Sequence, residues 1–126
     1  MNSARFDVLI VGGGFSGTIV AIQLLYRAPA LKIALLDKGS LPGRGVANAA
    51  NYKCHLLNLP ADMMSAFSEE PEHFLGWARA NYQPSLQARS FLPRAVYGRY
   101  MESLLQHGVA AAPEGTLSGL RMRLFR

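Results

Sequence analysis

Residues 6–17 read FDVLIVGGGFSG, and this stretch decides the fold. Its first six residues are mostly apolar and rich in β-branched side chains, which is typical of a strand buried on both faces of a parallel sheet. Glycines end the strand, and residues 16–26 then carry apolar side chains three or four apart, as in a helix packed on a sheet. A second apolar run, 31–37, predicts the next strand. Residues 5–37 therefore form one βαβ unit.

The glycines at the junction of strand and helix match the spacing G-x-G-x-x-G. Gly12 permits the tight turn, Gly14 lets a pyrophosphate approach the backbone, and Gly17 lets helix and strand pack closely. The N–H groups of the first helical turn then face the phosphates at the positive end of the helix dipole. The residues of this loop expected to contact a dinucleotide are Gly12, Gly13, Gly14, Phe15, Ser16 and Gly17.

An acidic residue, Asp37, ends the second predicted strand, twenty residues after Gly17. A carboxylate at this place accepts hydrogen bonds from ribose hydroxyls and repels a 2′-phosphate, so NADP is disfavoured here. The bland alternative is a glycine turn without a ligand and a solvated Asp37. The dinucleotide site is favoured because the strand, the glycines, the helix, the second strand and the acidic residue follow one another in the expected order. FAD and NAD share this fingerprint, and the βαβ unit does not separate them.

Residues 38–68 are interrupted by proline, glycine and asparagine throughout, yet they carry many apolar side chains. This combination predicts an ordered loop that covers the cofactor. Arg44 stands between two glycines, and its planar guanidinium suits a phosphate of the dinucleotide. The alternative is an exposed arginine in a flexible turn. Lys38 and Gly45, next to Asp37 and Arg44, are counted among the expected cofactor-binding residues.

The remainder of the chain predicts helices and a last strand. Ser68 is expected to cap a helix over 69–82, with three glutamates in its first turn, where the dipole favours them. Pro93 opens a second helix that Gly108 is expected to end, so the helical segment covers 69–108. Residues 116–126 alternate between apolar and basic and predict a terminal strand. The whole chain, 1–126, is expected to be one domain.

The composition limits the class of protein. The chain has 126 residues, half of them hydrophobic, and a single cysteine, which excludes a disordered chain and an intramolecular disulfide framework. Its net charge of +5 suits an anionic cofactor, a nucleic acid, a membrane surface or simply a solvated surface. No dense run of basic residues, no long apolar span and no secretory signal is found, so we expect a cytoplasmic protein without nucleic-acid or membrane partners. No set of side chains has metal-ligand spacing, so no metal is expected.

Several blocks along the chain resemble those of a bacterial family of FAD/NAD(P)-binding proteins. The blocks are GRGVA at 43–47, HLLNLPA at 55–61, MSAF at 64–67, HFLGW at 73–77 and FLPRAVYGRY at 91–100. Together with the glycine fingerprint, the resemblance covers nearly everything from residue 7 to about residue 105.

The resemblance implies an α/β, Rossmann-like FAD/NAD(P)-binding domain that is the N-terminal part of a flavoprotein fold with two dinucleotide sites. FAD would lie on the N-terminal βαβ unit, and NAD(P)H would be the co-substrate bound by a later unit. Residues 55–61 would line the flavin site, with Asn58 as a hydrogen-bond partner of the flavin. More distant relatives include flavin-dependent monooxygenases. The resemblance assigns neither the substrate nor the catalytic residues.

Proteins of this family look several times longer than this chain, and residues 111–126 do not continue into a second glycine fingerprint. The expectation is the FAD-binding portion, a fragment, of a flavin-dependent, NAD(P)H-linked oxidoreductase that is catalytically incomplete alone. The alternatives are a dinucleotide-binding module without catalysis of its own and a truncated remnant that needs a second chain.

Overall fold

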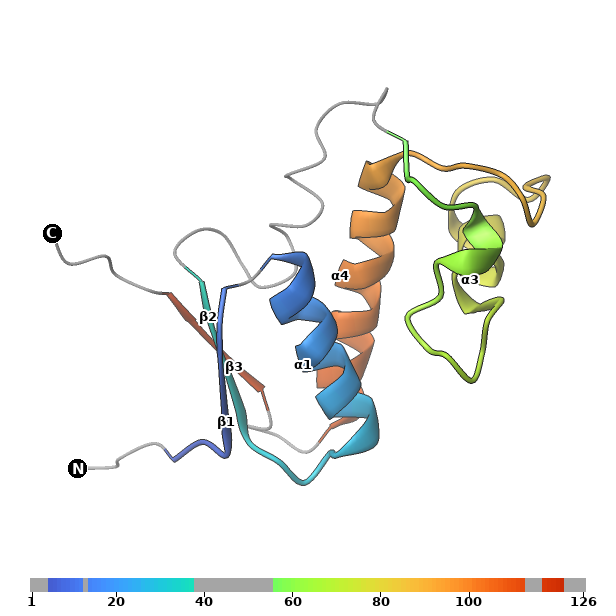
Figure 1. Cartoon of the computed structure of the whole chain (residues 1–126). Coiled ribbons are helices and arrows are strands. Elements are labelled where there is room, and N and C mark those ends of the chain that lie inside the picture. Colours follow the sequence, from blue (N-terminus) through green and yellow to red (C-terminus); the bar gives the residue numbers. More distant parts are fainter. Residues whose placement is uncertain (1–4, 13, 38–55, 113–116, 122–126) are drawn as a thin grey trace, which may run out of the picture. The chain divides into compact units, whose positions relative to one another are not determined.

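The computed structural model describes residues 5–12, 14–37, 56–112 and 117–121 (Figure 1). The chain divides into two compact units. Unit 1 contains residues 1–46 and 101–126, and unit 2 contains residues 47–100. Among the described residues, no helix is long and apolar enough to cross a bilayer.

Unit 1 is built on a parallel three-stranded sheet. Its strands are β1 (Val8–Val11), β2 (Ile33–Asp37) and β3 (Leu117–Arg121), in the spatial order β1-β2-β3. The central strand pairs in parallel with both neighbours, so that Ile33 lies opposite Val8 on one side and Leu117 on the other. The parallel pairing of β1 and β2, joined by a helix, confirms the predicted βαβ unit.

Helix α1 (Phe15–Arg27) lies beside the sheet, with the C-terminal part of α4 (Arg94–Ala111) on its other side (Figure 1). The buried side chains of α1 follow a helical spacing: Thr18, Ala21, Ile22 and Leu25. The hydroxyl of Tyr26 donates a hydrogen bond to the carbonyl oxygen of Leu104 on α4, at 3.3 Å.

Helix α4 runs on to Ala111, so the prediction that Gly108 ends it is wrong. A Cβ atom at Gly108 would lie 3.2 Å from side-chain atoms of both Leu25 and Tyr26 on α1. This glycine therefore serves the close approach of two helices. In the sequence, a glycine that ends a helix and a glycine that allows two helices to pack closely look the same.

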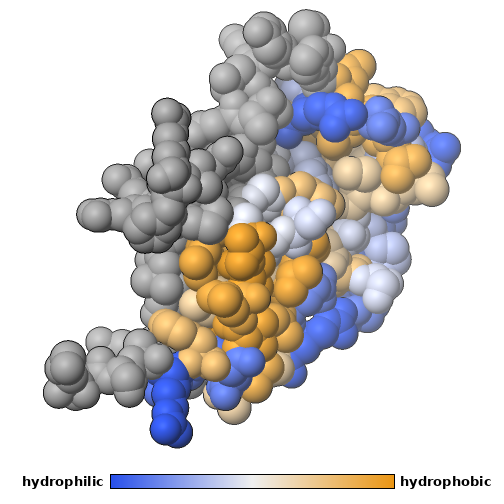
Figure 2. Space-filling model, turned by 60° about the vertical axis from the view of Figure 1, so that its left-hand side comes forward, coloured by the Kyte–Doolittle hydropathy of each residue, from blue (hydrophilic) through white to orange (hydrophobic). Residues whose placement is uncertain are grey.

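The two faces of β1 differ. Ile10 is buried, whereas Leu9 is 60% and Val11 is 64% exposed. In the described part of the chain, only one face of β1 is thus covered, and the expectation of a strand buried on both faces is wrong for it. Figure 2 shows hydrophobic residues gathered over a continuous part of the surface. In unit 1, β1 and α1 both carry large hydrophobic side chains that are exposed.

Unit 2 is described from residue 56 onward and contains the short helix η1 (Ala61–Met63), helix α3 (His73–Asn81) and the first seven residues of α4. Residues 56–62 run antiparallel to residues 88–93. The N–H of Leu57 donates to Leu92 O and that of Ala61 to Ser90 O, both at 2.8 Å. The described end of the predicted loop 38–68 is therefore ordered by backbone hydrogen bonds.

Helix α3 begins at His73, four residues later than predicted. Pro71 disfavours the helical conformation of the residue before it, so the chain turns over 67–72 instead. The N–H of Glu70 donates to Phe67 O at 3.1 Å, and the N–H of His73 donates to Glu70 O at 3.0 Å. The predicted Ser68 cap and acidic first turn are wrong, because Glu72 is the N-cap and the first turn holds no acid.

Aromatic rings form the core of unit 2. Phe74 and Tyr100 are fully buried, with ring centroids 4.9 Å apart, and Tyr97 packs edge-on against Phe74 at 5.0 Å. Burial raises the pKa of the Tyr97 hydroxyl far above its usual value, and the neighbouring Tyr100 adds to this effect.

The raised pKa of Tyr97 predicts a loss of stability at high pH. The folded pKa lies above that of the unfolded chain, about 10, so this contribution is complete below pH 10 and is lost as the pH rises beyond it. Above pH 10, the free energy of unfolding should fall by up to about 1.4 kcal/mol per pH unit because of this group. Urea unfolding between about pH 8 and pH 11 measures it, and Tyr97→Phe should flatten the dependence.

The matched control for this measurement is Tyr82→Phe, because Tyr82 is 45% exposed. Its stability should fall with pH as that of the unchanged chain does. A Tyr97→Phe variant that loses stability just as steeply would contradict the role of Tyr97.

Candidate dinucleotide site

The loop between β1 and α1 begins with a glycine in the left-handed region. Gly12 has φ +104°, a value that side chains with a Cβ rarely adopt. Its N–H donates to the carbonyl oxygen of Leu36 in β2 at 2.7 Å. The turn is therefore anchored to the neighbouring strand just where β1 ends.

Gly14 is the N-cap of α1, and its carbonyl oxygen accepts a hydrogen bond from the N–H of Thr18 at 3.0 Å. Within 4 Å, a Cβ built on Gly14 would meet no atom of the described residues. Gly14, Phe15 and Ser16 are all exposed, and the first turn of α1 carries no acidic side chain. The end of the helix where its dipole is positive is thus exposed.

At Gly17, unlike at Gly14, the structure leaves no room for a side chain. A Cβ there would overlap the carbonyl oxygen of Gly12 and lie 3.2 Å from Cγ2 of Ile10. The first turn of α1 therefore touches the end of β1 with no room for a side chain. Turn, open approach and close packing are the three roles that the G-x-G-x-x-G spacing assigns to its glycines.

Asp37 is the last residue of β2. Because β1 and β2 are parallel, both end at the same edge of the sheet. The carbonyl oxygen of Leu36, the residue before Asp37, accepts the hydrogen bond from the N–H of Gly12. The structure thus brings the backbone of Asp37 beside the glycine loop. The Asp37 side chain and all of Gly13, Lys38, Arg44 and Gly45 lie outside the described residues, and their cofactor contacts stay predictions.

The described residues of this loop fit a dinucleotide pyrophosphate. The N–H groups of the first turn of a helix lack acceptors within the helix, and phosphate oxygens supply them. The open space at Gly14 admits a phosphate, and no carboxylate in the first turn repels it. Among the described residues, no group of three or more His, Cys, Asp or Glu side chains could hold a metal ion.

Asn58 belongs to unit 2 and is exposed. Its Oδ1 accepts a hydrogen bond from Nη2 of Arg94, the first residue of α4, at 3.2 Å. Sequence reasoning missed this pair, because the two residues are 36 positions apart. The signal that sequence reasoning had was that each residue lies in one of the blocks that resemble the family, HLLNLPA and FLPRAVYGRY.

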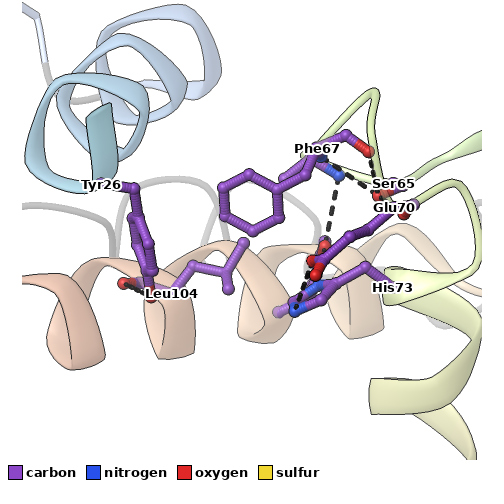
Figure 3. A network of polar contacts seen from close by, with 8 residues as sticks. Tyr26, Ser65, Phe67, Glu70, His73 and Leu104 are labelled. Carbon is purple, nitrogen blue, oxygen red and sulfur yellow. Dashed lines mark hydrogen bonds and ion pairs between the residues drawn. The ribbon is translucent and has the colours of Figure 1, made fainter.

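A second polar cluster of unit 2 ties the MSAF block to the helices (Figure 3). Ser65 Oγ donates to the carbonyl oxygen of Glu70 at 2.6 Å and accepts the N–H of Phe67 at 3.1 Å. Nδ1 of His73 lies 2.7 Å from the hydroxyl of Tyr100, which also accepts the N–H of Ala66 at 3.2 Å. These contacts fix residues 65–67 on α3 and α4, and they give His73 a structural role.

Two comparisons with known proteins agree with the geometry. Residues 9–124 match the sequence model of the FAD-NAD(P)-binding family. The chain is also 26% identical, over 106 residues, to the ribosomal RNA dihydrouridine synthase of Escherichia coli (strain K12). That match takes in 84% of this chain and 22% of the relative, so the chain spans less than a quarter of the relative's length. Since the family match covers most of the chain, the protein belongs to the FAD-NAD(P)-binding family.

Proposed function

We propose that this chain is the FAD-binding part of a flavin-dependent, NAD(P)H-linked oxidoreductase. The pyrophosphate lies on the loop from Gly12 to Gly17 and at the N-terminus of α1, and the ribose hydroxyls bond to Asp37. The observation that carries the proposal is the contrast between Gly14 and Gly17. A Cβ has free space at the first and none at the second, as a loop that cradles a phosphate requires.

FAD is preferred to NAD for two reasons. The blocks beyond the fingerprint resemble those of flavoproteins, and within this sequence the fingerprint precedes the blocks that would line the flavin. Arg44 is assigned to a phosphate of the cofactor. When bound, FAD supplies the redox chemistry, while residues of the chain bind it, orient it and set its electrostatic surroundings.

The first test is the visible absorption spectrum of the purified chain after addition of FAD and desalting. A retained flavin band with a shifted maximum is the expected result. Gly14→Ala should weaken FAD binding on the order of tenfold or more, because a methyl group takes the place of the phosphate and its hydrogen bonds are lost. Titration followed by flavin fluorescence measures the dissociation constant.

Gly76→Ala is the matched control, because Gly76 lies in α3 and a Cβ there also meets nothing within 4 Å. It should bind FAD as the unchanged chain does. A folded chain that retains no flavin, or a Gly14→Ala variant with unchanged affinity, would overturn the proposal. Bleaching of the bound flavin by NADH would favour an enzyme over the module without catalysis of its own.

A second candidate concerns the substrate of the whole protein. The E. coli relative is named for dihydrouridine formation in ribosomal RNA, and the net charge of +5 suits a polyanionic substrate. Saturating the C5=C6 bond of uridine needs a hydride and a proton, and a reduced flavin is a hydride donor. This candidate requires binding of ribosomal RNA that weakens steeply with salt. Equal affinity at about 50 and 200 mM salt would count against it.

A further inference from the structure

Met63, in the short helix η1 of unit 2, is an exposed methionine whose sulfur lies beside a cation. Met63 is 56% exposed, whereas Met64 is half-buried and Met101 is fully buried. Nη1 of Arg89 lies 3.7 Å from Sδ of Met63 and 3.4 Å from Oδ1 of Asp62. One guanidinium nitrogen therefore contacts both a thioether sulfur and a carboxylate.

Backbone hydrogen bonds place Arg89 opposite η1. The N–H of Ala61 donates to the carbonyl oxygen of Ser90 at 2.8 Å. The N–H of Asp62 donates to the carbonyl oxygen of Ala88 at 2.9 Å. Because these two bonds flank Arg89 in the sequence, the contact with Met63 follows from the pairing of two backbone segments as well as from the reach of a long side chain.

A hollow of about 160 Å³ lies beside Met63. Roughly 10–15 Å³ is enough to hold one water molecule, so the hollow has room for a molecule the size of hydrogen peroxide. Asp62 and Ser68 bring a carboxylate and a hydroxyl to the lining, and both accept hydrogen bonds from O–H groups. The lining residues are Asp62, Met63, Ser65, Phe67, Ser68 and Pro71.

We propose that Met63 is a site of oxidation by hydrogen peroxide and that its sulfoxide draws Arg89 away from Asp62. The sulfur attacks one peroxide oxygen, so that an S–O bond forms while the O–O bond breaks. The departing hydroxide takes the proton of the transferred hydroxyl and leaves as water, so the sulfur is oxidised and the peroxide is reduced. Arg89 stabilises that hydroxide, because a guanidinium is a cationic hydrogen-bond donor.

Oxidation changes which acceptor Arg89 prefers. A thioether sulfur is a weak acceptor, whereas the sulfoxide is polar and carries an oxygen. The Arg89 side chain is 72% exposed, so its ion pair with Asp62 is screened by solvent and contributes little. The guanidinium therefore bonds to the new oxygen and releases the Asp62 carboxylate into the hollow. This proposal needs no bound cofactor and is independent of FAD binding.

The experiment treats the full chain with dilute hydrogen peroxide and follows the sulfoxide at each methionine by fragment-ion mass spectrometry. Met63 should be oxidised at least about tenfold faster than Met101, which reagents reach only through local opening. Arg89→Leu should slow oxidation of Met63 roughly threefold to tenfold, because the departing hydroxide loses its donor. Arg89→Lys keeps a cationic donor and should restore most of the rate. Arg99→Leu is the matched control, because it removes the same charge from an exposed position of unit 2.

The NMR signal of the Arg89 Nε–H group tests the transfer of the guanidinium. It should shift when Met63 is oxidised and should stay in place when Met63→Leu receives the same treatment. Oxidation of Met63 no faster than that of Met101, or an unchanged rate in Arg89→Leu, would overturn the oxidation site. An Arg89 signal that complete oxidation of Met63 leaves unmoved would overturn the transfer from Asp62.

Discussion

Replacing Gly17 with alanine is expected to lower the free energy of unfolding by roughly 3 kcal/mol or more. The new methyl group would overlap the carbonyl oxygen of Gly12, which is backbone and cannot rotate away. Gly12 is itself held by its positive φ and by its hydrogen bond to Leu36. Relief therefore requires α1 to move off the end of β1, which also takes Ile10 out of its close contact with the helix.

Urea unfolding followed by circular dichroism measures this effect, with two glycine variants as controls. Gly14→Ala meets open space, so its cost should be limited to the poorer N-cap, about 1 kcal/mol. Gly76→Ala lies inside α3 with free space and should gain up to about 1 kcal/mol from helix propensity. If Gly17→Ala unfolded at the same urea concentration as Gly14→Ala, the close packing of α1 on β1 would be refuted.

The βαβ unit was predictable because its signals are local. The order of apolar run, glycines, helical spacing and second apolar run lies within residues 5–37 and needs no distant partner. The different roles of Gly12, Gly14 and Gly17 follow from the spacing alone, and the backbone geometry agrees with each. For the candidate site, sequence reasoning therefore found the loop and the strand end that carries Asp37.

The failed predictions concern residues whose effect depends on neighbours. Pro71 lies among glutamates that suit a first helical turn, and its restriction on Glu70 outweighed them, so α3 starts at His73. Gly108 lies in α4 because α1 passes too close for a side chain. The pairs Asn58–Arg94 and His73–Tyr100 join residues 36 and 27 positions apart, and no pattern in a single sequence joins them.

Tyr100 is the residue of unit 2 whose loss should cost most. It is fully buried, and its ring packs against Phe74, Trp77 and Tyr97 at centroid distances of 4.9, 5.4 and 5.5 Å. Tyr100→Ala removes this packing and leaves a cavity, so the expected loss is about 3–5 kcal/mol. Thermal or urea unfolding measures it.

Tyr100→Phe separates the hydroxyl from the ring. It keeps the packing but takes one acceptor from the N–H of Ala66 and the partner from Nδ1 of His73, at an expected cost of about 1–3 kcal/mol. The specific signature is faster hydrogen exchange of the Ala66 amide, because that N–H anchors the MSAF block to α4. Tyr82→Phe, at an exposed position, should change neither quantity.

The Tyr100→Phe result also tests the expectation that residues 55–61 line a flavin, since residues 64–67 follow them closely in unit 2. If the hydroxyl only stabilises the fold, FAD affinity should stay unchanged at temperatures where the variant is fully folded. If the hydroxyl also keeps this stretch in the shape that binds the cofactor, affinity should fall together with Ala66 protection. Unchanged stability and unchanged Ala66 exchange in Tyr100→Phe would refute the anchoring role of the hydroxyl and leave the ring as the only contribution of Tyr100.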